Sequence, residues 1–345
     1  MKCVEVAGSK FEVKNGFLDL GLLEIKDIIE IINLSNIKNL KNLELSSNEI
    51  SEINGLEGLT ELEILNLGSN NISKIKGLDN LENLEVLHLI SNHISEIQGL
   101  ENLDTLQELY LRGNQITSLK GLENLTSLKR LDLSWNFITD IEGLENLESL
   151  EVLWIAGNQL QQIKNVENLT NLEVLNLAGN QITSIEGLED LKNIKSIYLN
   201  NNLIPELKGF ETLEKLETLW LNSNQISRIR GLDNCKNMKI LNLKQNNITR
   251  IEGLYSLTKL ENLFLSENNI GEIKGLEPLT KLETLDLGQN QIIQVKGLES
   301  LINLKDLWLK ENLIPEKILD QLGNLDSGGC AIDPLKFVKY CLVNL

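Results

Sequence analysis

The stretch Leu62-Glu63-Ile64-Leu65-Asn66-Leu67-Gly68-Ser69-Asn70-Asn71-Ile72 returns along the chain, with few changes, every 22 residues. Its clearest landmark is an asparagine that recurs thirteen times without an insertion or deletion, at Asn48, Asn70, Asn92, Asn114, Asn136, Asn158, Asn180, Asn202, Asn224, Asn246, Asn268, Asn290 and Asn312. A fixed period in the twenties with fixed aliphatic positions is typical of a solenoid, in which each repeat buries its apolar face only against its neighbours. We therefore expect function to lie on a repeating surface.

One complete unit, starting at Leu62, reads L-x-x-L-x-L-x-x-N-x-I-x-x-I-x-G-L-x-x-L. The alternation around Leu65 and Leu67 predicts a short strand with these two side chains in the core and with Ile64 and Asn66 pointing outward. One strand per repeat predicts one parallel sheet. Few residues remain for the return path, so short 3₁₀ turns are expected there rather than long helices. Because neighbouring strands are spaced more widely than such turns, the sheet is expected to curve inward. The predicted fold is therefore a curved α/β solenoid, a horseshoe with a concave sheet and convex turns.

Two positions of the repeat are explained by the needs of the backbone. Each ladder asparagine stands where the chain leaves its strand, and its amide can bond the turn backbone of its own and the adjacent repeat. The second position predicts a positive φ angle, because Asn165 is the only substitute for glycine in the series Gly55, Gly77, Gly99, Gly121, Gly143, Gly187, Gly209, Gly231, Gly253, Gly275 and Gly297.

The period is unbroken over residues 40–314, which predicts one elongated repeat domain between two caps. The first cap, residues 1–39, is expected to be a small β structure, because Asn15-Gly16 is typical of a two-residue hairpin turn. A degenerate half-repeat follows this turn, with Lys26 in the place of the ladder asparagine.

The second cap, residues 315–345, is expected to be helical. Pro315 can open a helix that runs towards Gly323, and Asp333-Pro334 can start a second helix as an N-cap followed by a first-turn proline. The second helix is expected to cover the last repeat with a face formed by Leu335, Val338 and Leu342.

Composition limits the classes of partner. The formal charge of −18 disfavours nucleic acid and anionic membranes, which both need a basic surface. The first residues contain no signal-peptide core, and no apolar run is long enough to cross a bilayer, so we expect a cytoplasmic protein, or a nuclear one in a eukaryote. Cys235 takes a core position of its repeat. A Cys330–Cys341 bridge stays an open alternative that a reducing compartment disfavours.

A central row of outward strand residues gives the strongest functional signal, and reads Glu44, Asn66, His88, Tyr110, Asp132, Trp154, Asn176, Tyr198, Trp220, Asn242, Phe264, Asp286 and Trp308. Together with Trp135 and Phe137 beside the following turn, it holds eight of the fourteen aromatic residues of the chain. Large aromatic side chains next to hydrogen-bonding groups are typical of protein-binding hot spots. Aromatic residues also suit strands and stabilise one another across them, which is the structural alternative.

Catalysis and metal binding find little support in the sequence. The two histidines, His88 and His93, are expected on the sheet side, but the same positions of adjacent repeats supply neither an orienting carboxylate nor a third metal ligand. The glycines are spaced a full repeat apart, so they do not form a phosphate-binding loop. We expect no catalytic residue, no metal and no cofactor.

The repeat resembles the leucine-rich repeats of 22 residues, a class that includes the leucine-rich nuclear regulatory subunit of protein phosphatase-1 and the bacterial internalins. Of these two, Leu62-Glu63-Ile64-Leu65-Asn66-Leu67 and Ile141-Glu142-Gly143-Leu144 look closer to the phosphatase subunit. That subunit uses aromatic and acidic concave residues to hold its partner, and the resemblance implies such positions for Asp132, Trp154, Tyr198, Trp220, Phe264, Asp286, Asp306 and Trp308.

The sequence thus predicts a monomeric, non-enzymatic scaffold that binds a protein on its concave face. The predicted site residues are Tyr110, Asp132, Trp135, Trp154, Tyr198, Trp220, Phe264, Asp286, Asp306 and Trp308, and by resemblance the partner is a type-one-like protein phosphatase. A small-GTPase or cytoskeleton adaptor, a cell-surface adhesin and a carbohydrate-binding module that stacks sugars on the tryptophans are the alternatives.

Overall fold

A computed structural model describes residues 3–343 of the chain, which form short strands joined by turns. Contacts divide the chain into two compact units, and each is described by itself. The first unit comprises residues 1–160 and 164–172, and the second comprises residues 161–163 and 173–345. The expected boundaries of the two caps at residues 39 and 315 stay a prediction.

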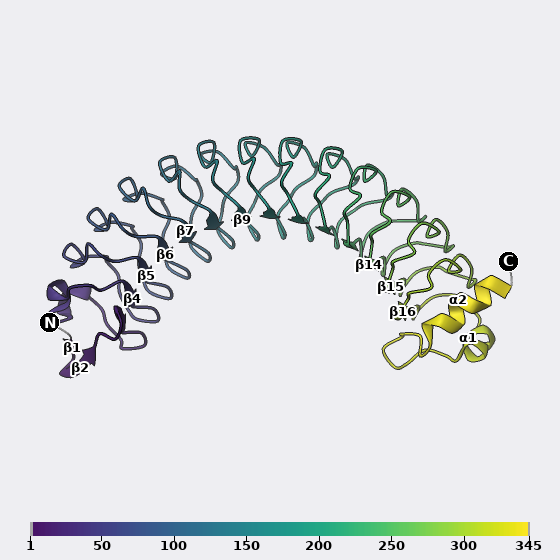
Figure 1. Cartoon of the computed structure of the whole chain (residues 1–345), viewed down its shortest axis with the longest axis horizontal. Coiled ribbons are helices and arrows are strands. Elements are labelled where there is room, and N and C mark those ends of the chain that lie inside the picture. The colour runs from purple at the N-terminus through teal and green to yellow at the C-terminus, as the bar shows by residue number, and fades with distance from the viewer. Residues whose placement is uncertain (1–2, 344–345) are drawn as a thin grey trace. The chain divides into compact units, whose positions relative to one another are not determined.

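The first unit begins with an antiparallel hairpin of β1 (Cys3–Val6) and β2 (Ser9–Glu12). Two 3₁₀ helices, Ile28–Glu30 and Leu34–Asn36, precede the repeats. The parallel sheet of this unit runs in chain order through β3 (Phe17–Asp19), β4 (Asn42–Glu44), β5 (Ile64–Asn66), β6 (Val86–His88), β7 (Glu108–Tyr110), β8 (Arg130–Asp132) and β9 (Val152–Trp154). Within the unit these strands lie side by side on the inner side of its bend, and the turns lie on the outer side (Figure 1).

The second unit continues the same pattern with β10 (Val174–Asn176), β11 (Ser196–Tyr198), β12 (Thr218–Trp220), β13 (Ile240–Asn242), β14 (Asn262–Phe264), β15 (Thr284–Asp286) and β16 (Asp306–Trp308). Two helices follow, α1 (Glu316–Leu322) and α2 (Pro334–Val343). Between the helices the chain covers the edge of β16, where Ala331 N–H donates to the Leu307 carbonyl at 2.7 Å. Among the described helices, none combines the length and the apolar character that a membrane span needs.

The core of each unit is the stack of its aliphatic positions. Leu65 and Leu67 are fully buried, as the alternation predicts, and Leu43 and Leu65 are direct partners in the register of β4 and β5. Each such side chain contributes roughly 1.5–3 kcal/mol of gross transfer free energy, which chain entropy largely offsets. Identical positions in successive repeats therefore meet each other in one continuous core.

The ladder asparagines bond the backbone of two repeats, as predicted. Asn70 Oδ1 accepts the N–H of Ile50 from the preceding repeat at 3.0 Å. Asn70 Nδ2 donates to the carbonyls of Leu45, also in the preceding repeat, at 3.0 Å and of Leu67 at 3.1 Å. The amide thus satisfies three buried backbone groups that have no strand partner.

The return path consists of tight turns with hydrogen bonds between residues three apart. Leu81 N–H donates to the Leu78 carbonyl at 2.9 Å, and Leu84 N–H donates to the Leu81 carbonyl at 3.0 Å. Asn165 has a φ angle of 59°, which confirms that its position, glycine in the other repeats, requires a positive φ. The expected leucine-rich solenoid with short 3₁₀-type turns is confirmed.

One expectation for the first cap is wrong. Lys26 does not occupy the ladder position, because β3 pairs with β4 at an offset of 25 residues, Leu18 being opposite Leu43. Asn48 accordingly accepts from the N–H of Ile25 at 3.0 Å, so the first turn of the solenoid contains three extra residues. Counting back by 22 residues misplaced the register.

The expected face of α2 is correct for Val338 but wrong for Leu335 and Leu342. Leu335 and Leu342 are 38% and 50% exposed, and the residues of α2 that are buried are Phe337, Val338 and Cys341. The helix is therefore rotated about its axis relative to the prediction, so that Phe337, its largest fully buried side chain, enters the core. The start of α2 after Asp333 and the end of α1 at Gly323 agree with the boundaries predicted from the sequence.

Candidate functional site

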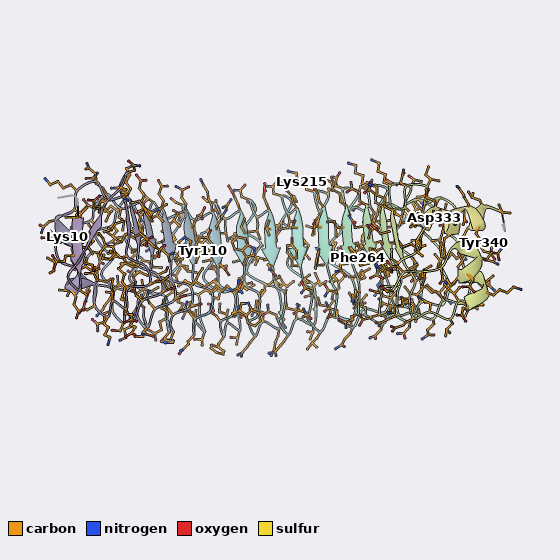
Figure 2. The ribbon with its side chains drawn as sticks, turned by 90° about the horizontal axis from the view of Figure 1, so that it is seen from below. Lys10, Tyr110, Lys215, Phe264, Asp333 and Tyr340 are labelled. Atoms are coloured by element: carbon orange, nitrogen blue, oxygen red, sulfur yellow. The ribbon has the colours of Figure 1, made fainter. Side chains whose placement is uncertain are left out.

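The last residue of each sheet strand points away from the core, since it lies between two buried neighbours. Trp154, for example, is half-buried between Leu153 and Ile155, which are both fully buried. We use the name sheet face for the surface of each unit that these central-row residues and their outward neighbours form. Figure 2 looks onto the strands and labels one central-row residue of each unit, Tyr110 and Phe264.

In the first unit the predicted site residues lie on three consecutive strands. Tyr110 is opposite Asp132 in the register of β7 and β8, and Asp132 is opposite Trp154 in the register of β8 and β9. Trp135 follows in the turn after β8, where 61% of its surface is exposed. The structure thus brings these four residues into one region.

Tyr110 is held by its neighbours on the sheet face. Its hydroxyl donates to Glu108 at 2.6 Å, and Arg130 pairs with the same carboxylate at 3.4 Å. Its ring stacks on His88 with centroids 4.5 Å apart and an angle of 3° between the planes. Burial raises the pKa of Tyr110 to about 12, and the hydrogen bond to Glu108 and its charge add to the effect. The phenol is therefore a neutral, positioned group at physiological pH.

In the second unit an aromatic pair lies on β11 and β12. Tyr198 and Trp220 are direct register partners, with ring centroids 6.0 Å apart and planes inclined by 50°. Such tilted packing is favourable for aromatic rings. Trp220 keeps 37% of its surface exposed, so the pair offers a large apolar area to a ligand.

The remaining predicted residues of the second unit lie on β14 to β16. Phe264 is opposite Asp286, and Asp286 is opposite Trp308. Asp306, the first residue of β16, accepts a hydrogen bond from Thr284 at 3.4 Å. Phe264 and Trp308 are half-buried, so an acidic group stands between two partly accessible rings.

The acidic residues of the central row have a structural task that sequence reasoning missed. Asp132 Oδ1 accepts the N–H of Ser134 at 2.9 Å, and Asp286 Oδ1 accepts the N–H of Gly288 at 3.1 Å. The same bond to the residue two positions on is made by Asn66, Asn176 and Asn242. Asp and Asn therefore alternate with aromatic residues partly because their side chains cap the turn.

Sequence reasoning left Phe137, an exposed aromatic residue beside the turn after β8, out of the predicted site. Phe137 directly follows a ladder asparagine and is 50% exposed, and Leu203 and Leu313, at the same position of other repeats, are 45% and 64% exposed. The signal was available, since the neighbouring repeats hold Gln115 and Gln159 at this position.

The histidines and cysteines do not form a metal site within residues 3–343. His88 is engaged in the ring stack with Tyr110, and burial lowers its pKa. Over residues 3–343 no three side chains of His, Cys, Asp or Glu are arranged to hold a metal ion. All four cysteines, which lie within this range, are free. Burial raises the pKa of Cys235 to about 12, as its core position implies.

Comparison with known proteins identifies the repeat. The family model described as "Leucine Rich repeats (2 copies)" matches the chain in overlapping or adjoining pairs of repeats, at residues 38–80, 60–102, 82–124, 104–146, 126–169, 170–215, 214–256, 236–278 and 258–299. No curated protein sequence matches significantly.

Solved structures are similar over most of the chain. An internalin from Listeria monocytogenes is 32% identical with a TM-score of 0.78, and the match covers 85% of this chain and 86% of the internalin. A leucine-rich repeat protein of Leptospira interrogans is 29% identical with a TM-score of 0.68, and the match covers 89% and 93%. The ectodomain of the Arabidopsis thaliana receptor kinase GASSHO1/SCHENGEN3, solved with CASPARIAN STRIP INTEGRITY FACTOR 2, shares the fold at 23% identity, with a TM-score of 0.67 and coverage of 89% and 40%.

Proposed function

Because this chain belongs to the leucine-rich repeat family, whose domains serve as scaffolds for protein–protein interaction, we propose that it is a non-enzymatic scaffold whose sheet face binds a protein through its aromatic residues. The observation that carries the proposal is the partly exposed Tyr198–Trp220 pair on β11 and β12. A large apolar ring that keeps contact with water costs free energy in the free protein, and a partner that covers it recovers this cost.

The surroundings of this pair favour a protein interface. The outward residues of β10, β11 and β12 are Val174, Asn176, Ser196, Tyr198, Thr218 and Trp220, and none of them is charged. The chain as a whole is 24% charged. Interface cores are depleted in charge and enriched in Trp and Tyr, because a charge would have to lose its water on binding. The amide and hydroxyl groups among these residues can bond the backbone of a partner.

Affinity capture from a cell lysate of the source organism tests the proposal. The full chain is compared with the triple variant Trp154→Ala, Trp220→Ala and Trp308→Ala, after circular dichroism has shown that the variant is folded. We expect a protein retained by the natural chain to be lost by the variant. Tyr255→Ala is the matched control, because Tyr255 is 83% exposed but follows a Gly-Leu turn away from the strands. Equal capture by all three forms would refute the proposal.

A narrower hypothesis names a type-one-like protein phosphatase as the partner. It rests on the resemblance of the repeats and on the alternation of Phe264, Asp286 and Trp308 along β14 to β16. We expect purified catalytic subunit to bind the natural chain and to bind Trp308→Ala more weakly in a titration. Binding of neutral oligosaccharides to the natural chain without any protein partner would instead favour a carbohydrate-binding module.

A further inference from the structure

Trp135 occupies a backbone conformation that suits a bulky side chain poorly. Its φ angle is 59°, in the left-handed region. The same position has a positive φ in the other repeats, where the residues are Ser47, Ser69, Ser91, Gly113, Gly157, Gly179, Asn201, Ser223, Gln245, Glu267, Gln289 and Glu311. Bulky residues are genuine outliers in this region, and strained residues are retained mainly where they have a task.

Burial does not explain the choice of tryptophan, because 61% of Trp135 is exposed. The strained conformation is set by the neighbouring repeats. Trp135 N–H donates to the Ala156 carbonyl at 2.7 Å, and Phe137 N–H donates to the Ile116 carbonyl at 2.9 Å. The turn is thus tied to the repeat on either side, and the two exposed rings stand on a fixed backbone.

The ring of Trp135 is positioned by a glycine of the next repeat. A Cβ atom on Gly157 would lie 2.9 Å from Cδ2 of the Trp135 ring, so a residue with a side chain at position 157 would displace it. The ring therefore lies against the backbone of Gly157. Two residues on, Phe137 is 50% exposed, and we use the name apolar patch for these two exposed residues of the turn after β8.

In both neighbouring repeats, uncharged residues take the positions of Trp135 and Phe137. Gly113 and Gly157 stand at the position of Trp135, and Gln115 and Gln159 stand at the position of Phe137. A ligand that covers the two rings therefore removes no charge from water at these four positions. This favours an apolar, uncharged ligand, since uncompensated burial of a charge costs far more than apolar burial gains.

We propose that Trp135 and Phe137 form a rigid apolar anchor that binds an uncharged, apolar segment of a protein partner. The inference rests on the proposed function and extends the binding surface from the sheet face to the turn after β8. Rigid aromatic side chains bind tightly because little conformational entropy is lost on association. A lipid surface is disfavoured as the occupant, because the chain carries a net charge of −18.

A display library of random 12-residue peptides is the probe. It is selected on the natural full chain, and binding of the enriched peptides is then measured with the double variant Trp135→Ser, Phe137→Gln. Both new residues occur at these positions in other repeats of the same chain, as Ser91 and Gln115. We expect enriched peptides without charged residues in their apolar segment, whose affinity falls by about tenfold or more in the variant.

Two controls keep the test specific. Leu313→Gln removes an apolar side chain that is even more exposed than Phe137, at the equivalent position of the second unit, and should leave binding unchanged. Thermal unfolding of the double variant should match that of the natural chain. An unfolding midpoint that falls in the double variant would assign the rings a structural role and overturn the proposal.

The other outcomes are equally decisive. The anchor would be overturned if the selection enriched no peptides. It would also be overturned if the enriched peptides bound both forms equally or bound through charged segments. Peptides lost by the Trp154, Trp220 and Trp308 variant but kept by the double variant would leave the proposed function standing and refute the anchor alone. Binding of the natural chain, but not the double variant, to phosphatidylcholine vesicles would replace the peptide by a lipid.

Discussion

The side-chain oxygen of Asn70 accepts the backbone N–H of Ile50, in the preceding repeat, at 3.0 Å, so each ladder asparagine joins two turns of the solenoid. Asn70→Ala would leave this N–H without its acceptor, while the carbonyls of Leu45 and Leu67 would keep only the bonds from Asn48 and Asn92. An unpaired buried group costs about 1–3 kcal/mol, and we expect the free energy of unfolding in urea to fall by at least this amount. Asn71→Ala, at an exposed position, should change it by less than about 0.5 kcal/mol.

Asp132 caps the turn that follows β8, because its Oδ1 accepts the N–H of Ser134 at 2.9 Å. Asp132→Asn keeps this acceptor, as Asn66 does in its own repeat, whereas Asp132→Ala removes it. We expect the Ala variant to lose about 1 kcal/mol or more in denaturant unfolding and the Asn variant to match the natural chain. Equal losses in both variants would show that the charge, and not the cap, stabilises the turn.

Gly121 has a φ angle of +100°, and a Cβ atom there would lie 2.1 Å from the Ile97 carbonyl oxygen. Gly121→Ala combines backbone strain with this clash, and we expect it to lower the unfolding free energy by more than about 1–2 kcal/mol. Gly271→Ala is the matched control, since a Cβ atom there meets nothing within 4 Å. A Gly121→Ala variant as stable as the control would contradict the close stacking of these turns.

Tyr110 should ionise late in an alkaline titration. Burial and Glu108 raise its pKa from 10.0 to about 12, so the folded chain holds the proton more tightly than the unfolded chain. The stabilisation is therefore complete below pH 10 and is lost as the pH rises through 12. Ultraviolet difference titration should show a phenolate step near pH 12 that is absent in Tyr110→Phe. In Glu108→Gln the step should move to lower pH but stay above 10, since burial remains.

The cysteines should differ in their reaction with iodoacetamide. Cys235 and Cys341 are buried and burial raises the pKa of both thiols, while Cys3 is half-exposed. We expect peptide mass spectrometry of the natively alkylated chain to find Cys3 modified first and Cys235 and Cys341 only after denaturation. The non-reduced chain should have the mass of four free thiols. A mass lower by two hydrogens, together with a linked pair of Cys330 and Cys341 peptides, would establish the bridge that the sequence left open.

The 22-residue period was sufficient to predict the fold class, the buried strand residues and the ladder bonds. Identical units have one way to bury Leu65 and Leu67 together, which is to stack in register. The same logic failed at the caps, where the repeat ends. Three extra residues before Asn48 shift the first register, and the buried face of α2 depends on where Phe337 finds space.

The central row of aromatic residues was also visible in the sequence, because a period of 22 places every outward strand residue on one face. The exposed fraction of each aromatic side chain was not visible in the sequence. Trp220 is 37% exposed and Phe137 is 50% exposed, while Trp154 is half-buried, and the sequence period does not distinguish these cases. The turn-capping bond of Asp132 likewise became apparent only from the backbone geometry.

The sequence by itself therefore determined which residues face inward and which face outward, since that choice depends on local period and on hydrophobicity. Only the tertiary structure decided what each outward residue does. The strained conformation of Trp135, its contact with Gly157 and the stack of His88 on Tyr110 arise between repeats, where residues about 22 apart in the chain come within contact distance. Such contacts depend on three-dimensional packing, and a one-dimensional pattern does not contain them.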